Sequence, residues 1–305
     1  TSPPPRSHQM IQAWDQQLAL KQATTQLGIC SDEGVRRNKG RIGARNGPRA
    51  IRGALVNLAY HNTAPCFDAG DILCSVQNLE QAQTLLAEKI TAILQRQGFP
   101  MVLGGGHEVA WGHFLGVTHY LRQSDAKRRL GIINFDAHLD LRNPEPQANS
   151  GTSFRQIAQW CAKENKPFDY LVFGVDNSAN SAALFEYAKQ HKVQWFEDCA
   201  CTLDCLPELN TGIAELLQRV DDIYLSICMD VFPAGAAPGV SSPAALGVQP
   251  LVVIKLLRYL KDLCAQQNVR LITADIAEMN PDFDQDGITA KLAARLVHEI
   301  THAAK

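Results

Sequence analysis

The sequence predicts an α/β fold in which one mostly parallel sheet is covered by helices on both faces, giving three layers (α/β/α). Five short apolar runs are typical of strands buried on both faces; they lie at 99–103, 130–135, 170–175, 223–227 and 269–274. Segments with helical spacing of apolar residues lie between these runs, and alternating strands and helices indicate a parallel sheet. Polar residues directly follow several runs, at the carboxyl ends of strands where such sheets bind ligands.

Local signals support individual elements. A helix is expected between Asn78, which can cap its first turn, and Gly98, which can end it. A later helix is expected to begin at Pro250, because proline is favoured in the first helical turn. No repeat or break in composition divides the chain. We therefore expect a flexible N-terminal tail over residues 1–10 and a single domain over residues 11–305.

The composition argues against several classes of protein. The 305 residues carry 29 Lys and Arg against 31 Asp and Glu, a net charge of −2. Nucleic acid is therefore not an expected partner, because phosphate binding requires a surplus of cations. No apolar run approaches the roughly 18 residues of a membrane helix, so no membrane partner is expected either. Nine cysteines, an odd number, favour reduced thiols in a cytoplasmic protein.

Side chains that can bind a metal follow three of the predicted strands. Asp136, His138 and Asp140 alternate along the chain, so their side chains lie on one side of an extended segment. His107 follows three glycines, which allow a tight backbone turn, and Asp230 follows a third strand. Carboxylates and imidazoles suit Mn²⁺ better than a structural Zn²⁺. The set is large enough for two ions about 3.5–4 Å apart that share a carboxylate.

The order of several motifs resembles the arginase–agmatinase (ureohydrolase) family. The motifs are GGGHE at 104–108, NFDAHLDLR at 134–142, GTSFR at 151–155, the stretch 226–239 and EMNPDFD at 278–284. The resemblance spans about residues 34–289. It implies an arginase-like fold, Mn²⁺ dependence and a homo-oligomer, either a trimer or a hexamer. The metal ligands that it implies are His107, Asp136, His138, Asp140 and Asp230, with Asp136 bridging two ions.

One position departs from the family pattern. The third strand of the family usually ends in S-x-D-x-D, and Cys228 stands where the first of these aspartates helps to bridge the ions. Cys228 is a candidate ligand because coordination lowers the pKa of a thiol. Sulfur also shifts the preference toward softer ions such as Zn²⁺ or Fe²⁺. We therefore expect a retained Mn²⁺ site with a weakly held second ion, and a metal-poor, non-enzymatic relative is the alternative.

A cation beside the predicted metals indicates the charge of the substrate. Arg142 stands two residues beyond Asp140, where arginase-like members carry an uncharged residue. Its guanidinium can bind a carboxylate through two hydrogen bonds, which predicts a small anionic amino-acid substrate. Asn149 and Ser150 are further candidate substrate contacts. Among the family's reactions we expect hydrolysis of N-formimidoyl-L-glutamate to L-glutamate and formamide; agmatinase or another guanidino hydrolase is the nearest alternative enzyme.

Two acidic residues are expected to take part in the reaction. Asp140 would deliver a proton to the departing amine after a metal-activated water attacks the formimidoyl carbon. Glu278 matches the family's acidic residue after the last core strand and would pair with the cationic amidine. Seven basic residues lie between Arg36 and Arg52 without an intervening acid, and most of them are expected to be solvated.

Two other patterns are interpreted as structural. The sequence HEITH at 298–302 resembles a zinc-protease signature, but both histidines fall opposite the apolar stripe of their helix. We therefore expect them to face solvent. The aspartates at 282–286 resemble the start of a calcium loop but lack its final Glu, so a turn and helix cap are expected there.

Overall fold

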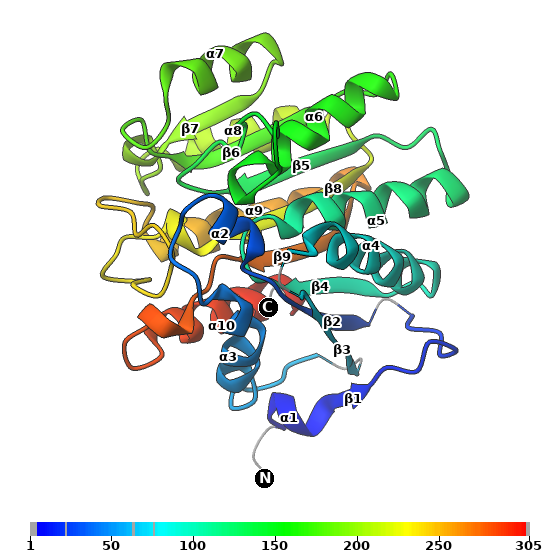
Figure 1. The fold of residues 1–305 in the computed structure, drawn as a ribbon. Helices are drawn as coiled ribbons and strands as arrows, with labels where there is room; N and C mark the ends of the chain where they lie inside the picture. Colours follow the sequence, from blue (N-terminus) through cyan, green and yellow to red (C-terminus); the bar gives the residue numbers. More distant parts are fainter. Residues whose placement is uncertain (1–4, 22, 63–64, 76, 303–305) are drawn as a thin grey trace.

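A computed structural model describes residues 5–21, 23–62, 65–75 and 77–302 (Figure 1). The strands are β1 (Ile11–Ala13), β2 (Thr24–Cys30), β3 (Cys66–Leu73), β4 (Phe99–Leu103), β5 (Leu130–Phe135), β6 (Asp169–Val175), β7 (Gln194–Glu197), β8 (Asp222–Cys228) and β9 (Arg270–Ala277). Within the described residues they form one sheet in the order β1-β3-β2-β4-β9-β8-β5-β6-β7, and every pair is parallel. The predicted α/β class is confirmed.

The helices cover both faces of this sheet. They are α1 (Ser7–Met10), α2 (Glu33–Arg37), α3 (Gly47–Leu55), α4 (Leu79–Gln95), α5 (Val109–Ser124), α6 (Ser153–Lys163), α7 (Ala182–Gln190), α8 (Leu206–Leu217), α9 (Pro250–Gln267) and α10 (Ile288–Thr301). Short 3₁₀ turns are η1 (Ala44–Asn46), η2 (Ser150–Thr152), η3 (Asp198–Ala200), η4 (Met229–Val231) and η5 (Pro281–Phe283). The predicted helix after Asn78 is α4, and the one beginning at Pro250 is α9.

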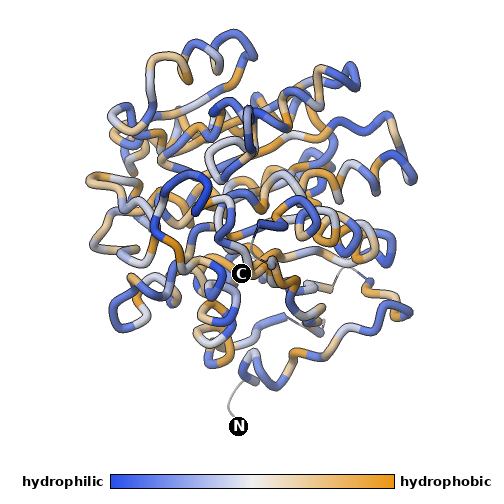
Figure 2. Tube along the Cα trace, in the orientation of Figure 1, coloured by the Kyte–Doolittle hydropathy of each residue, from blue (hydrophilic) through white to orange (hydrophobic). Residues whose placement is uncertain are grey.

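Alternate residues of the central strands enter different hydrophobic cores. In β5, Ile133 packs in the core that lies under α3, α8, α9 and α10, whereas Ile132 packs on the opposite face with residues of α5, α6 and α7. Figure 2 shows hydrophobic segments along the strands and hydrophilic residues in the outer turns. Burial on both faces explains why these strands have continuous apolar sequences.

The five predicted strands correspond to β4, β5, β6, β8 and β9. The strands β1, β2, β3 and β7 were not predicted, and their sequences explain why. Strand β2 buries Thr25 and Gln26 among its apolar residues, and β3 mixes aspartates with apolar residues. All four residues of β7 are only partly buried. Such strands owe their conformation to their place in the sheet rather than to an apolar run.

Part of the predicted flexible tail has a regular conformation. Residues 1–4 of the tail lie outside the described residues, but Ser7–Met10 form α1. The backbone N–H of Ser7 donates to the carbonyl of Leu58 at 3.0 Å, and Ser7 is buried. These contacts hold α1 against the segment that follows α3. Across the described residues, no helix has the length and apolar character needed to cross a bilayer.

Candidate metal centre

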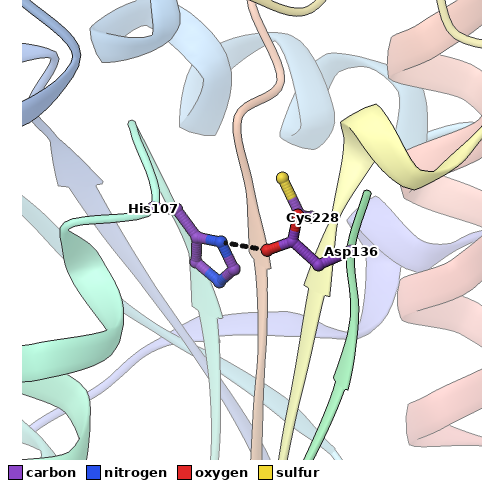
Figure 3. A group of neighbouring side chains, drawn as sticks. All are labelled: His107, Asp136 and Cys228. Atoms are coloured by element: carbon purple, nitrogen blue, oxygen red, sulfur yellow. Dashed lines mark ion pairs between the residues drawn. The ribbon is translucent and has the colours of Figure 1, made fainter. Parts of the chain in front are cut away.

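Predicted metal ligands and the predicted catalytic residue Glu278 lie at the carboxyl ends of four adjacent central strands. His107 follows β4, Asp136 follows β5, Cys228 ends β8, and Glu278 follows β9. Figure 3 shows His107, Asp136 and Cys228 gathered at these strand ends. Strands β4 and β5 follow each other in the sequence, but β9 and β8 lie between them in the sheet. A ligand site at such a switch point is typical of parallel α/β sheets.

Two groups of three donor atoms share one carboxylate. His107, Asp136 and Cys228 offer ligand atoms that lie within 4.8 Å of one another, and so do Asp136, His138 and Asp230. The shared residue is Asp136, which was predicted to bridge two ions. Two ions joined by one carboxylate require this arrangement.

Unpaired buried atoms support a cation at this centre. His107 Nδ1 lies 2.8 Å from Asp136 Oδ2 and 3.0 Å from Asp140 Oδ2. Despite these short contacts, Nδ1 makes no hydrogen bond to any described residue, and neither does the buried Asp230 Oδ1. Buried polar atoms without partners are rare in proteins. The carboxylate and imidazole donors therefore fit a divalent cation such as Mn²⁺, and Cys228 is the single soft donor among them.

The buried groups shift one another's pKa values. Burial alone would lower the pKa of His107, but the carboxylate of Asp136 and its neighbours raise it well above its usual range. The pKa of His138 is raised in the same way, against burial, by Asp230 and Asp136. Burial, reinforced by Asp136 and Asp230, raises the pKa of the Cys228 thiol well above its usual range. A cation that binds these groups must displace their protons.

Two residues of the centre have a left-handed backbone. The φ angle is 50° at Asp140 and 66° at Glu278. Such a conformation costs about 1–3 kcal/mol in a residue other than glycine, so surrounding contacts must hold it. Hydrogen bonds hold both positions: Phe154 N–H donates to the carbonyl of Asp140 at 3.2 Å, and Glu278 N–H donates to that of Gly105 at 2.8 Å.

One carboxylate oxygen of Glu278 accepts a hydrogen bond, and the other has no hydrogen-bond partner among the described residues. Its Oε1 accepts the backbone N–H of His107 at 2.8 Å. Its Oε2 is buried and has no hydrogen-bond partner among the described residues. Burial, with the nearby carboxylates of Glu108 and Asp230, raises the pKa of Glu278 well above its usual range. The free oxygen is therefore placed to accept a hydrogen bond from a cationic ligand.

A cavity of about 340 Å³ opens onto the centre. Arg142 and Ser150, both predicted to contact substrate, line it. Asn38 connects these two side chains, because it accepts a hydrogen bond from Arg142 Nη1 at 2.8 Å and donates to Ser150 Oγ at 3.2 Å. Of the predicted site residues, those that also line the cavity are His107, His138, Asp140, Cys228, Asp230 and Glu278.

Asn149 lies outside the lining of this cavity, and its role as a substrate contact stays a prediction. Its Oδ1 accepts the N–H of Gly151 at 2.9 Å, and its own N–H donates to Thr152 Oγ1 at 3.0 Å. Asn149 thus caps η2. It fixes the turn that presents Ser150.

Most of the basic residues between 36 and 52 are exposed, as expected, but some of them also make specific contacts. Arg37 has a side chain only 3% exposed, which pairs with Glu33 at 2.9 Å and Glu80 at 2.6 Å. Lys39 and Arg41 line the cavity. The sequence signal for these residues is the run of seven cations without an acid, a pattern that a purely solvated segment does not require.

The histidines of the HExxH pattern line a different cavity, at the end of α10. The rings of His298 and His302 stack with their centroids 3.9 Å apart, and His302 packs edge-on against Tyr60. Both histidines are partly buried, which corrects the expectation that they face solvent. Burial, with the neighbouring His298, lowers the pKa of His302 to about 4.

Comparisons with known proteins agree with this geometry. A model of the Arginase family matches residues 23–303. A formimidoylglutamase of Aeromonas salmonicida is 43% identical over 296 residues, which cover 97% of this chain and 92% of the relative. A crystal structure of formimidoylglutamase from Bacillus subtilis has a TM-score of 0.83 at 23% identity, covering 98% of this chain and 92% of that one. Trypanosoma cruzi formiminoglutamase with Mn²⁺ has a TM-score of 0.79 at 25% identity, covering 98% of both chains.

Proposed function

This chain belongs to the arginase family, and on that premise we propose that it hydrolyses N-formimidoyl-L-glutamate to L-glutamate and formamide. The observation that carries the proposal is a single cavity lined by Glu278, Arg142 and all the proposed metal donors except Asp136. A substrate with a cationic amidine at one end and carboxylates at the other complements these groups in charge. The Aeromonas salmonicida relative, named for this activity, is similar over nearly its full length.

The cofactor that we propose is Mn²⁺, with two ions per chain. Bound Mn²⁺ lowers the pKa of water, which supplies a hydroxide nucleophile near neutral pH. The two groups of donors that share Asp136 support two ions rather than one. The residues proposed to hold them are His107, Asp136, His138, Asp140, Cys228 and Asp230.

The chain's own residues orient the substrate. The free Oε2 of Glu278 accepts an N–H of the cationic amidine, which brings the formimidoyl carbon to the metal centre. Arg142 binds a carboxylate of the glutamyl group, and its bond to Asn38 fixes the direction of its guanidinium. Lys39, on the wall of the same cavity, supplies a cation for the second carboxylate. Ser150 offers a hydroxyl between these charged groups.

Asp140 is the residue proposed to move the proton. Water adds to the formimidoyl carbon, and the bond from that carbon to the glutamate nitrogen then breaks. The departing amine needs a proton at this stage, and the water supplies one. The carboxyl group of Asp140 lines the same cavity, and we propose that it takes up this proton and returns it to the amine.

The test of this function is release of formamide from N-formimidoyl-L-glutamate by purified protein loaded with Mn²⁺. Arginine and agmatine serve as parallel substrates, and bound Mn²⁺ is counted in the same samples. We expect turnover of the formimidoyl compound alone, with about two ions per chain. Turnover of arginine or agmatine instead would contradict the substrate, and less than one bound ion after loading would favour a metal-poor, non-enzymatic relative.

We also propose a cytoplasmic homo-oligomer. All nine cysteines are free, as expected in a reducing compartment. The family resemblance favours a trimer or hexamer. Cell fractionation and light scattering of the purified protein test these two statements, and a monomer at working concentration would contradict the second.

A further inference from the structure

We propose that the buried, hydrogen-bonded pair of His113 and Asp275, acting through Ser226, fixes a hydrogen on Nε2 of the His107 ring. His113, Asp275 and Ser226 would thus be positioning residues for the metal centre. The inference rests on the proposed function for the role of His107 as a metal ligand. The hydrogen bonds that carry it can be read from the structure independently of that role.

The network lies between α5 and the two central strands β8 and β9. Its members are all 0% exposed: His113 from α5, Tyr224 and Ser226 from β8, and Thr273 and Asp275 from β9. A histidine and an aspartate this deeply buried require partners, because unpaired polar groups there are costly. The metal centre does not supply those partners directly, so another role must account for the pair.

The number of available hydrogens fixes the direction of each bond. The Thr273 hydroxyl donates its only hydrogen to the carbonyl of Pro100 at 2.8 Å. It must therefore accept at its contact with His113 Nε2, 2.7 Å away, so Nε2 carries a hydrogen. The other ring nitrogen, Nδ1, lies 2.7 Å from Asp275 Oδ2, and a second proton occupies that contact.

Asp275 receives hydrogen bonds from three residues. The Tyr224 hydroxyl donates to Oδ2, and the Ser226 hydroxyl donates to Oδ1 at 2.7 Å. Asp275 Oδ1 therefore takes up the hydroxyl hydrogen of Ser226, which points away from His107.

Ser226 transmits this arrangement to His107. Because its only hydrogen goes to Asp275, Ser226 Oγ can only accept from His107 Nε2, which lies 2.9 Å away. His107 Nε2 therefore carries hydrogen, which leaves Nδ1 as the ring nitrogen that can bind a cation. Nδ1 faces Asp136 and Asp140, where the cation is proposed to lie. A cation that binds there displaces only a proton on Nδ1, and the hydrogen on Nε2 stays in place.

The first test reads the ring nitrogens of the full-length protein directly. Metal-free protein with ¹⁵N-labelled histidine rings is studied by NMR, and the signals of His107 and His113 are assigned with single His→Asn variants. We expect hydrogen on Nε2 of both His113 and His107. Hydrogen on Nδ1 alone of either histidine would overturn the inference.

The second test measures the Mn²⁺ affinity without substrate, by EPR of the free ion. In Asp275→Asn, the new amide can donate to Ser226, which frees the serine hydrogen to point at His107 Nε2 and places a hydrogen on Nδ1. We expect the affinity to fall about 10–100-fold, the range typical of residues that orient metal ligands. An Asp275→Asn protein that folds and binds Mn²⁺ as the wild type does would contradict this expectation.

Substitutions at Ser226 leave His113 and Asp275 unchanged. They provide a second comparison in case Asp275→Asn does not fold. Ser226→Ala should weaken Mn²⁺ binding, and Ser226→Thr, which keeps the hydroxyl, should restore it. Thr118→Val removes another buried hydroxyl, on α5 but outside the network, and should leave the affinity unchanged. Equal affinities for Ser226→Ala and Ser226→Thr would refute the transmission through Ser226. Protein with the expected spectra and affinities but no turnover of N-formimidoyl-L-glutamate would refute the proposed function alone.

Discussion

A substitution of one side chain, Arg142, tests whether the substrate carries a carboxylate that this guanidinium binds. Its guanidinium reaches the cavity from outside the metal centre, where its Nη1 donates to Asn38. In Arg142→Gln we expect KM for N-formimidoyl-L-glutamate to rise about 10–100-fold. This is the loss of affinity expected when a charge-assisted hydrogen bond to a carboxylate is removed. We expect kcat to change little, because this bond forms equally in the ground and transition states.

Steady-state kinetics separates these two constants. Arg129→Gln is the matched control, because Arg129 is half-exposed, pairs only loosely with Asp221 at 3.7 Å and lies outside this cavity. It should leave both constants unchanged. A large fall in kcat for Arg142→Gln with KM preserved would place Arg142 in the chemical step instead.

A substitution at Cys228 tests how a sulfur donor affects the preference of the site for one metal over another. Its sulfur is the soft member of the donor group that also contains His107 and Asp136. Cys228→Asp replaces the thiol with the carboxylate usual in the family, so we expect tighter Mn²⁺ binding relative to Zn²⁺ and a second Mn²⁺ that is retained more firmly. Competition titrations with the two ions measure the change.

The control for this substitution is Cys264→Ala, since Cys264 is buried in α9 and belongs to neither donor group. It should leave the preference between the ions unchanged. An unchanged preference in Cys228→Asp would exclude Cys228 as a ligand.

At the scale of elements, the turn after β4 depends on the absence of a side chain. A Cβ at Gly105 would lie 1.7 Å from the carbonyl oxygen of Ser31, a backbone atom that cannot move aside cheaply. Gly105→Ala should therefore displace the turn that carries His107, lower the melting temperature and weaken Mn²⁺ binding at least tenfold.

The matched control is Gly53→Ala on α3, where a Cβ meets nothing within 4 Å. In a helix this substitution should stabilise the protein by about 0.5–1 kcal/mol. Thermal unfolding and Mn²⁺ titration of the two variants compare the same chemical change at a crowded and an open position. Equal behaviour of the two variants would contradict a tight fit at Gly105.

The elements also show what local sequence can and cannot reveal. The strands β4, β5, β6, β8 and β9 were predicted because burial on both faces leaves a continuous apolar run. The ligands after them were predicted because each lies next in sequence to a strand end. Strand β2 was missed because Thr25 and Gln26 are buried by neighbours β3 and β4. Its buried polar residues become favourable only once those neighbours are in place.

Across the whole molecule, the missed parts of the site come from pairings between distant segments. Asn38 connects to Arg142 and Ser150, more than 100 residues away in sequence. His113 meets Asp275 across 162 residues. Neither pair carries a local pattern, since each residue alone is unremarkable in its segment. Long-range packing therefore determines the part of the site that orients side chains, whereas short motifs determine the part that is proposed to bind the metal.

The end of α10 links the stability of the whole molecule to pH. His302 stacks on His298, and its pKa is lowered to about 4 by burial, His298, His61 and Lys261. In the unfolded chain its pKa is near 6.5. Between these two values the unfolded chain binds a proton that the folded chain does not, so the free energy of unfolding falls as pH drops through this window. Partial exposure screens the effect, and we expect a loss of about 1–2 kcal/mol.

Urea unfolding at pH 7 and pH 5 tests this contribution. The free energy of unfolding should fall less between the two pH values in His302→Gln than in the wild type, by about that same 1–2 kcal/mol, because a glutamine side chain does not titrate. His119→Gln, at an exposed position on α5, is the control and should lose as much stability as the wild type. If His302→Gln loses as much as His119→Gln, the acid sensitivity arises elsewhere, and the stacked histidines contribute packing alone.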